Sequence, residues 1–307
     1  MFRQFLLGSA VSLVIPVAAA DSPPRVAVDI APVHSLVAQV MAGVGSPDLL
    51  IRPQASPHTY SLRPSEAEAL SRAEVVFWMS EGITPWLEHS LANLAGSATQ
   101  VKMLAVEGTA LYDYREGATF ESHDHHDGPQ AEEHHDDRDP HAWLDPVNAK
   151  VWVKMIATVL SGQDAANAHI YQRNAEAAIV ALDELIASIQ QQAQSLEGIR
   201  FIVFHDAYQY FERRFGLLAS GAIAVGDASD PSPARIEEIH ETVAALGVTC
   251  VFTEPQYNPS MVRTVFRNTP VNTIGVMDPH GADIDVGKDH YPKLLNAMIA
   301  SLNQCES

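Results

Sequence analysis

Histidine is the residue type in this chain most able to bind metal ions or transfer protons, and fourteen histidines occur among its 307 residues. Five of them crowd one acidic stretch, Glu121 to Asp139, together with eight carboxylates and one arginine. Imidazole and carboxylate suit borderline divalent metals, and a stretch of this composition cannot bury a core. We expect it to bind several metal ions weakly; the alternative is a solvated acidic loop. The five are His123, His125, His126, His134 and His135.

Three further histidines stand apart in the chain but occupy similar places. His58 lies in a polar turn between a predicted strand and a helix, and His141 comes just before a helix start. His205 directly follows the apolar run 201–204, at the carboxyl end of a predicted strand. Open α/β sheets bind ligands beyond the carboxyl ends of their strands, so these side chains could meet at one cleft. Taken singly, each is more often structural than a ligand.

The remaining six histidines have no such support, and we interpret them as surface or packing residues. Only His280 is singled out, because it lies close to Asp278. The six are His34, His89, His169, His240, His280 and His290.

The segments that must position these residues predict an α/β protein of two similar lobes with parallel sheets. Short apolar strands alternate with helices in each half, which is typical of sheets covered on both faces. The first half has expected strands at 26–30, 74–78 and 101–106 and expected helices at 32–41, 65–71 and 85–94. The second half has expected strands at 200–204, 217–223, 248–253 and 271–276 and expected helices at 233–246, 259–268 and 291–302.

A helical region separates the two halves. Asp145 and Pro146 start a helix through Leu160, and residues 164–196 follow without glycine or proline. We expect this second segment to be one rod of about 50 Å that connects the lobes, with a coiled coil as the alternative. Its expected apolar face is Ile170, Ala177, Ala181, Leu185 and Ile189. The predicted division is 21–163, including the loop 107–140, then the linking helix 164–196, then 197–307.

The first twenty residues have the pattern of a cleaved secretory signal. Arg3 supplies a basic start, 5–17 is apolar, and Ala18 to Ala20 supply small residues. The apolar run is shorter than the roughly 20 residues that span a bilayer. Signal peptide 1–20 therefore predicts export, with cleavage near Ala20. An oxidising compartment and an even count of cysteines fit one bridge, Cys250 to Cys305, with two buried thiols as the alternative.

Composition excludes other classes of protein. The formal charge of −19 argues against a nucleic-acid partner, since phosphate binding needs a basic surface. A hydrophobic content of 47% argues against a disordered acidic chain.

Several motifs in this order resemble the metal-binding proteins of bacterial metal ABC importers, specifically the periplasmic zinc-binding ZnuA type. The matching stretches are 57–65, 139–146, 204–211, Thr253 to Gln256, and Asp278-Pro279 followed by Gly281. The resemblance covers essentially the whole mature chain. It implies two α/β lobes joined by one rigid helix, with the metal between them. It also implies a disulfide at the cysteine pair and a His-rich loop.

The resemblance further implies that His58, His141 and His205 are nitrogen ligands, with Asp278 or water as the fourth. Manganese and iron relatives usually carry Glu where His205 stands, and imidazole favours Zn²⁺. Some relatives carry Glu just before the first histidine, where this chain has Pro57. The candidate partners that could fix the tautomer of a ligand histidine are Asp139, Asp206 and Glu254.

The expected function is non-enzymatic: high-affinity capture of periplasmic Zn²⁺ and delivery to the inner-membrane permease of a zinc ABC transporter. The His-rich loop would assist acquisition or sensing, periplasmic zinc chaperones are further candidate partners, and the chain is expected to be a monomer. A Mn²⁺ or Fe²⁺ importer component is one alternative. A secreted zinc hydrolase with Glu254 as general base is the other, although no H-E-x-x-H signature occurs.

Overall fold

Two four-stranded parallel sheets form two lobes with the same strand order. The computed structural model describes residues 22–115, 120, 138–224, 232–257 and 259–305. The order is β2-β1-β3-β4 in the first lobe and β6-β5-β7-β8 in the second. All strand pairs within both sheets are parallel, so the predicted two-lobe α/β class is confirmed.

The first lobe follows the predicted alternation closely. Its strands are β1 (Val26–Val28), β2 (Asp48–Leu49), β3 (Val75–Trp78) and β4 (Thr99–Lys102). Its helices are α1 (Ala31–Val40), α2 (Pro64–Arg72) and α3 (Leu87–Leu94). The prediction of a strand at 101–106 is wrong in its second half, where Met103–Ala105 forms a 3-10 helix. The two-residue strand β2 is too short for an apolar pattern to reveal it.

The second lobe carries β5 (Phe201–His205), β6 (Gly221–Ala224), β7 (Cys250–Thr253) and β8 (Thr273–Val276). Its helices include α7 (Pro233–Leu246), α8 (Pro259–Val265) and the unpredicted α6 (Gln209–Phe215). Helix α6 ends at Gly216, whose φ of 72° is a left-handed conformation that glycine adopts without strain. The strand predicted from Leu217 begins only at Gly221, because residues 217–220 form the turn out of α6.

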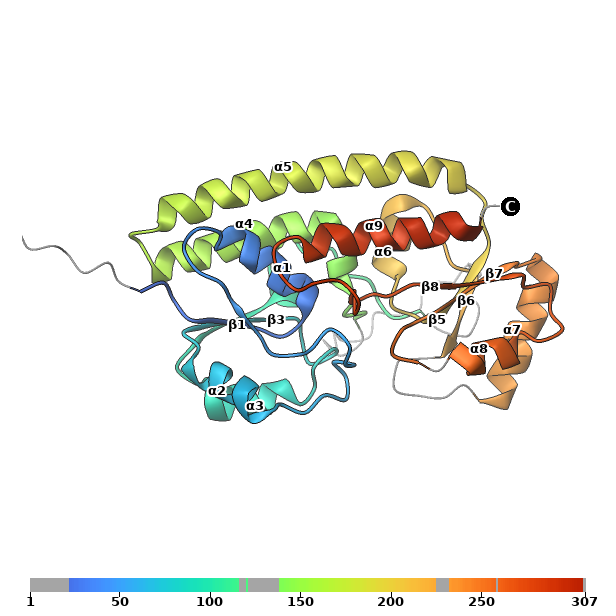
Figure 1. Ribbon diagram of the computed structural model, residues 1–307, viewed down its shortest axis with the longest axis horizontal. Coiled ribbons are helices and arrows are strands. Elements are labelled where there is room, and N and C mark those ends of the chain that lie inside the picture. Colours follow the sequence, from blue (N-terminus) through green and yellow to red (C-terminus); the bar gives the residue numbers. More distant parts are fainter. Residues whose placement is uncertain (1–21, 116–119, 121–137, 225–231, 258, 306–307) are drawn as a thin grey trace, which may run out of the picture.

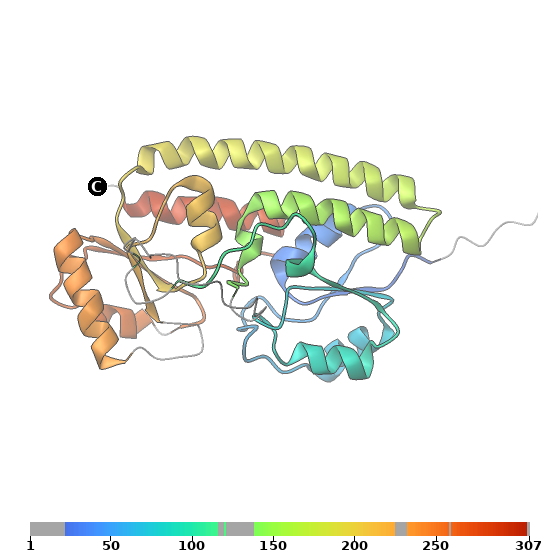
Figure 2. The ribbon, with the colours of Figure 1, turned by 180° about the vertical axis from the view of Figure 1, so that it is seen from behind.

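A layer of helices runs along one side of both lobes, formed by α1, α4 (Pro146–Gln163), α5 (Ala168–Ala193) and α9 (His290–Leu302) (Figure 1). Helix α5 lies across the top of both lobes in that view, and the reverse view agrees (Figure 2). Helix α9 packs against α1 of the first lobe as well as against α5. Helix α5 therefore carries the chain from the first lobe to the second, as predicted, and α9 packs beside it across the junction. The exact boundaries between domains stay a prediction.

The linking helix differs from expectation at its start and in its buried face. It begins at Ala168 because the Asp164 carboxylate accepts from the Asn167 N–H and from the Tyr171 hydroxyl, at 3.3 and 2.8 Å. A 3-10 turn, Gln194–Leu196, follows its end. Ala177 and Ala181 are exposed. The buried positions alternate at three and four residues and are Tyr171, Ala175, Ala178, Leu182, Leu185 and Ile189.

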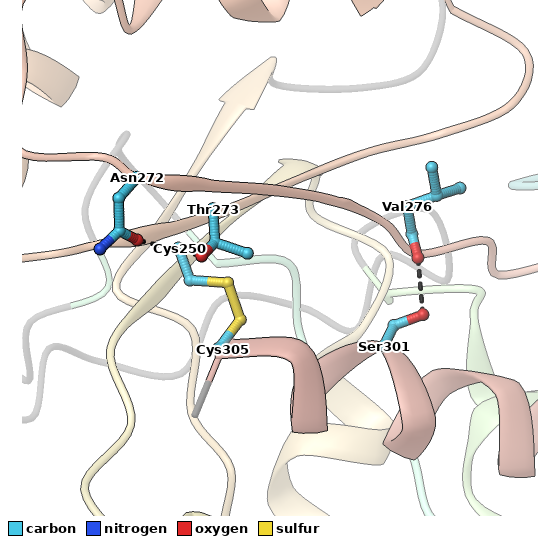
Figure 3. The surroundings of a disulfide bond; sticks show 6 residues. All are labelled: Cys250, Asn272, Thr273, Val276, Ser301 and Cys305. Carbon is cyan, nitrogen blue, oxygen red and sulfur yellow. Dashed lines mark hydrogen bonds between the residues drawn. A yellow bond between two sulfur atoms is a disulfide. The ribbon is translucent and has the colours of Figure 1, made fainter. Parts of the chain in front are cut away.

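A disulfide joins Cys250 at the start of β7 to Cys305, just after α9, with a Cα–Cα distance of 5.6 Å (Figure 3). The Ser301 hydroxyl donates to the Val276 carbonyl nearby, at 2.6 Å. The predicted bridge is thus confirmed. It fastens the end of α9, which packs on the first lobe, to the central part of the second sheet.

Some predicted features fall outside the described residues. The signal segment 1–20 is one, and the other is most of the acidic loop with its five histidines. Among the helices that the structure describes, none has the length and apolar character to cross a bilayer.

Candidate metal centre

The three predicted ligand histidines lie together where the lobes meet. His58 follows β2, His141 precedes the 3-10 turn Ala142–Leu144, and His205 is the last residue of β5. The ring centroids of His58 and His141 are 6.1 Å apart, and those of His141 and His205 are 5.4 Å apart. His141 and His205 are only 3% and 4% exposed, whereas His58 is partly exposed. Two of the predicted ligands, from one lobe, therefore approach the third from the other lobe.

Each buried histidine of this trio is held by a buried carboxylate through Nδ1. His141 donates from Nδ1 to Asp139 Oδ1 at 2.7 Å, and His205 donates from Nδ1 to Glu254 Oε1 at 2.6 Å. The register of β5 and β7 brings His205 and Glu254 side by side. Phe201 is paired with Cys250, and His205 and Glu254 each lie four residues further along the chain. With Nδ1 protonated, Nε2 carries the lone pair, and this tautomer is the one that metal-binding histidines with a carboxylate partner adopt.

Burial governs the electrostatics of these carboxylates. It raises the pKa of Asp139 to about 6, while the backbone N–H of His141 and the Gln209 amide oppose the rise. Burial also raises the pKa of Glu254, against the effects of His205 and Tyr208. A cation arriving at the histidines would favour the ionised form of both carboxylates.

The start of α6 contacts both histidine–carboxylate pairs. The Tyr208 hydroxyl lies 3.0 Å from Glu254 Oε1 and 2.9 Å from the Met277 carbonyl oxygen. Gln209 donates from Nε2 to Asp139 Oδ2 at 3.0 Å, and the Tyr210 hydroxyl donates to the Asp139 carbonyl at 2.7 Å. The short α6 had no apolar pattern to announce it, although the motif 204–211 contains its first residues.

Asp278 lies in a loop after β8 whose backbone is tied down on several sides. Its two carboxylate oxygens accept from the backbone N–H groups of His280 and Ala282. Trp143 Nε1 donates to the Pro279 carbonyl at 2.8 Å, and His290 Nε2 donates to the His280 carbonyl at 2.8 Å. Asp278 therefore acts as an acceptor for its own loop, in addition to any role toward a metal.

His280 was expected to be incidental, yet the fold brings it to this site. It is 8% exposed, and its ring lies 5.0 Å from that of Trp143, which in turn lies 5.2 Å from His141. Burial lowers the pKa of His280 to about 3, although Asp278 opposes the shift. The nearby histidines His141, His58 and His205 lower it further. His280 is therefore a neutral imidazole beside the predicted ligands.

Arg115 joins the root of the acidic loop to the second lobe. Its guanidinium contacts Asp206 from Nε at 2.9 and 3.0 Å and Glu212 from Nη1 at 2.7 Å. It also lies over the Phe120 ring, 3.6 Å from the centroid. Asp206 was a candidate partner for a ligand histidine, but its described partner is Arg115, and Asp139 and Glu254 hold the histidines instead.

The predicted ligands lie near one another, but their side chains do not form a complete metal site in this structure. Among the described His, Cys, Asp and Glu side chains, no group of three or more is arranged to hold an ion as it stands. Zinc takes nitrogen ligands at about 2.0–2.1 Å. The two carboxylates fix the ring nitrogen that His141 and His205 would present to it.

Known proteins resemble this chain over nearly its full length. The high-affinity zinc uptake system protein ZnuA of Brucella suis biovar 1 (strain 1330) is 40% identical over 306 residues, which covers 92% of this chain and 91% of that protein. The protein of the same name from Paracoccus denitrificans (strain Pd 1222) is 38% identical over 301 residues, with coverage of 92% and 91%.

Solved structures share the fold. A crystal structure described as ZnuA has 25% identity and a TM-score of 0.75, and the match covers 92% of this chain and 99% of that one. A laminin-binding adhesin of Streptococcus agalactiae, in a mutant structure, also has a TM-score of 0.75, covering 92% and 100%, but its 22% identity supports the fold alone. The sequence model of the ZnuA family, described as the periplasmic component A of a zinc-uptake complex, matches residues 26–305. The chain therefore belongs to the ZnuA family, whose members are binding components of an importer and not enzymes.

Proposed function

We propose that the chain captures Zn²⁺ between its lobes through His58, His141 and His205 and delivers it to the permease of a zinc ABC transporter. The observation that carries the proposal is the pair of buried histidine–carboxylate contacts, 2.7 and 2.6 Å long, on rings 5.4 Å apart from opposite lobes. This arrangement presents Nε2 of both rings, as zinc-binding histidines require. Membership of a family of binding components sets aside the hydrolase alternative.

Three imidazoles favour Zn²⁺ over Mn²⁺ and Fe²⁺, which suit oxygen-rich sites better. Asp278 is the proposed fourth ligand, through lone pairs that its loop hydrogen bonds do not use. Water is the alternative, and His280 is a further candidate because it lies buried beside the trio. A Mn²⁺ or Fe²⁺ carrier remains the alternative function.

The test is a competition titration of the zinc-free protein with Zn²⁺ and Mn²⁺. We expect Zn²⁺ to bind with one tight site and Mn²⁺ to displace it poorly. Replacing His58, His141 and His205 together by Ala should remove the tight site. Because neutral imidazole binds the ion, affinity should also fall as pH drops through about 6.5. Tight Mn²⁺ binding, or tight zinc binding that survives the triple replacement, would overturn the proposal.

The acidic loop is proposed to collect Zn²⁺ for this site through His123, His125, His126, His134 and His135. Family membership supports export to the periplasm. We propose that the signal peptide is cleaved near Ala20 and that the protein functions as a monomer. The loop's contribution is tested by deleting residues 121–137. The deletion must stop before Asp139, because that carboxylate holds His141. We expect one tight Zn²⁺ to remain while the additional weak sites disappear; loss of the tight site would refute the division of roles.

A further inference from the structure

We propose that Gln209 is a positioning residue for His141, so that the second lobe orients a metal ligand of the first. The inference rests on the proposed function, because the orientation of His141 matters only if it binds the metal. Gln209 begins α6 and is 1% exposed. It does not touch the histidine; it acts through the carboxylate of Asp139.

The contacts run in one line from α6 to the ring. Gln209 Nε2 donates to Asp139 Oδ2 at 3.0 Å. The other carboxylate oxygen, Oδ1, accepts from His141 Nδ1 at 2.7 Å and from the His141 backbone N–H at 3.0 Å. With one oxygen held from each side, the carboxylate cannot turn without breaking a hydrogen bond. The plane of the carboxylate sets the direction of the His141 ring.

The orientation of the amide is fixed by its surroundings. Nε2 faces two acceptors, Asp139 Oδ2 and the carbonyl oxygen of Asp113, both at 3.0 Å. An amide flipped by half a turn would direct its oxygen at these acceptors and lose both bonds. Asp113 belongs to the strand-like bridge with Arg138, which closes the base of the acidic loop. The Gln209 amide nitrogen therefore contacts both Asp113, at the start of the loop, and the Asp139 carboxylate that holds His141.

Packing alone does not account for an amide at this position. Gln209 Oε1 is buried and has no hydrogen-bond partner among the residues that the structure describes. A buried carbonyl oxygen without a partner lowers stability, and an apolar side chain of the same length would avoid that loss. The two donations from Nε2 are what the glutamine adds.

The neighbours of Gln209 extend the same arrangement to both lobes. The Tyr210 hydroxyl donates to the Asp139 carbonyl at 2.7 Å, so Asp139 is held by its backbone as well. The Tyr208 hydroxyl reaches Glu254, the partner of His205. Three consecutive residues of α6 and its cap thus contact the carboxylate partners of ligands from both lobes. A shift of one lobe against the other would disturb His141 through Gln209.

The experiment measures how fast zinc leaves the loaded protein when a chromophoric chelator in excess captures it. Gln209→Met keeps the length of the side chain and removes the amide. Changing a hydrogen-bond partner of a metal-bound histidine weakens metal binding about 10–100-fold. Because Gln209 acts through such a partner, Asp139, we expect zinc release about tenfold faster, at the lower end of that range. The matched control is Gln172→Met on α5, whose amide donates to Ser161 Oγ at 3.2 Å on the exposed surface. Its release rate should equal that of the unmodified protein. Equal rates for Gln209→Met and Gln172→Met would overturn the inference.

A second background separates positioning of His141 from a general loosening of the fold. In a His141→Ala protein, Gln209→Met should not accelerate release further, because the ligand that it positions is gone. Equal acceleration in both backgrounds would overturn the inference. If methionine prevents folding, Gln209→Asn carries the same expectation, since it draws the amide back by one methylene. If the unmodified protein retains no zinc, or His141→Ala does not speed its release, the proposed function fails and not merely this inference.

Discussion

At the scale of single residues, the site depends on atoms that do not bind the metal. His141 and His205 meet their carboxylates at 2.7 and 2.6 Å inside a nearly solvent-free region. The carboxylates fix the tautomer that each proposed ligand presents. Tyr208, Gln209 and Tyr210 contact these two acidic residues in turn.

Asp278 offers a first residue-scale prediction, because it serves its loop as well as the proposed metal. Its oxygens accept from the N–H groups of His280 and Ala282, both of which are buried residues. Asp278→Ala should lower the free energy of unfolding of the zinc-free protein by about 1–3 kcal/mol, since two donors lose their acceptor. Denaturant melts check this. Asp278→Asn is the control; it keeps one acceptor oxygen and should lose about half as much stability as Asp278→Ala. An unchanged midpoint for Asp278→Ala would show that the loop bonds contribute nothing.

His34 provides a pH-dependent prediction away from the site. It lies buried in α1, where its Nε2 donates to the Pro47 carbonyl at 3.1 Å. Burial lowers its pKa in the folded protein, so the unfolded chain binds the proton first as pH falls. Stability from the neutral ring is therefore present above about pH 6.5, the unfolded value, and is lost below it.

Replacing this ring should flatten the acid limb of the stability curve. The unfolding free energy of His34→Gln should fall less between pH values of about 6.5 and 4.5 than that of the unmodified protein. His89→Gln is the control, because His89 is exposed on α3. Parallel slopes for all three proteins would contradict the assignment.

At the scale of elements, the apolar strands and the long helices were predictable, because each buries a periodic or continuous apolar surface. Helix α7 begins and ends at the predicted residues, since Ser232 caps its start and Gly247 follows its end in a left-handed conformation. Helix α6 was not predictable from its pattern, because its seven residues include the buried polar side chains Gln209 and Glu212. The assignment of His58, His141 and His205 as ligands came from the resemblance and not from spacing, and it stays a prediction. Gln209 and Arg115 could be found only from the folded contacts.

Arg115 gives the prediction that belongs to this scale, because it fastens the loop root to α6. The side chain of Glu212 is 1% exposed, so removing Arg115 leaves a buried carboxylate without its cation. Arg115→Ala should cost about 3–5 kcal/mol of stability, as loss of one partner from a buried ion pair does. Arg115→Lys should recover only part, since one ammonium cannot reproduce a fork that contacts two carboxylates. Chemical denaturation measures both, and a loss below about 1 kcal/mol would mean that water replaces the guanidinium.

At the scale of the whole molecule, two helices brace the lobes against each other. Helix α5 joins the lobes along the chain, as expected, and α9 adds a second brace because it packs on α1 and α5 and ends at the disulfide to β7. Each helix resists bending over its length, and together they oppose hinge closure more than one helix would. The disulfide fixes the far end of α9, so it belongs to the same mechanical unit.

Zinc loading should therefore change the overall shape very little. Hinged binding proteins close around their ligands by rotating whole domains, and that rotation needs a few backbone residues free to bend. Here such a rotation would have to bend α5 and slide α9 against α1, and it would break the Gln209–Asp139 contact across the lobes. Small-angle X-ray scattering curves of the protein with and without Zn²⁺ should superimpose. Separating α9 from β7 by replacing Cys250 and Cys305 with Ser removes one constraint, so the zinc-dependent change should grow in that variant. A large compaction of the unmodified protein on loading would mean that the lobes hinge despite both helices.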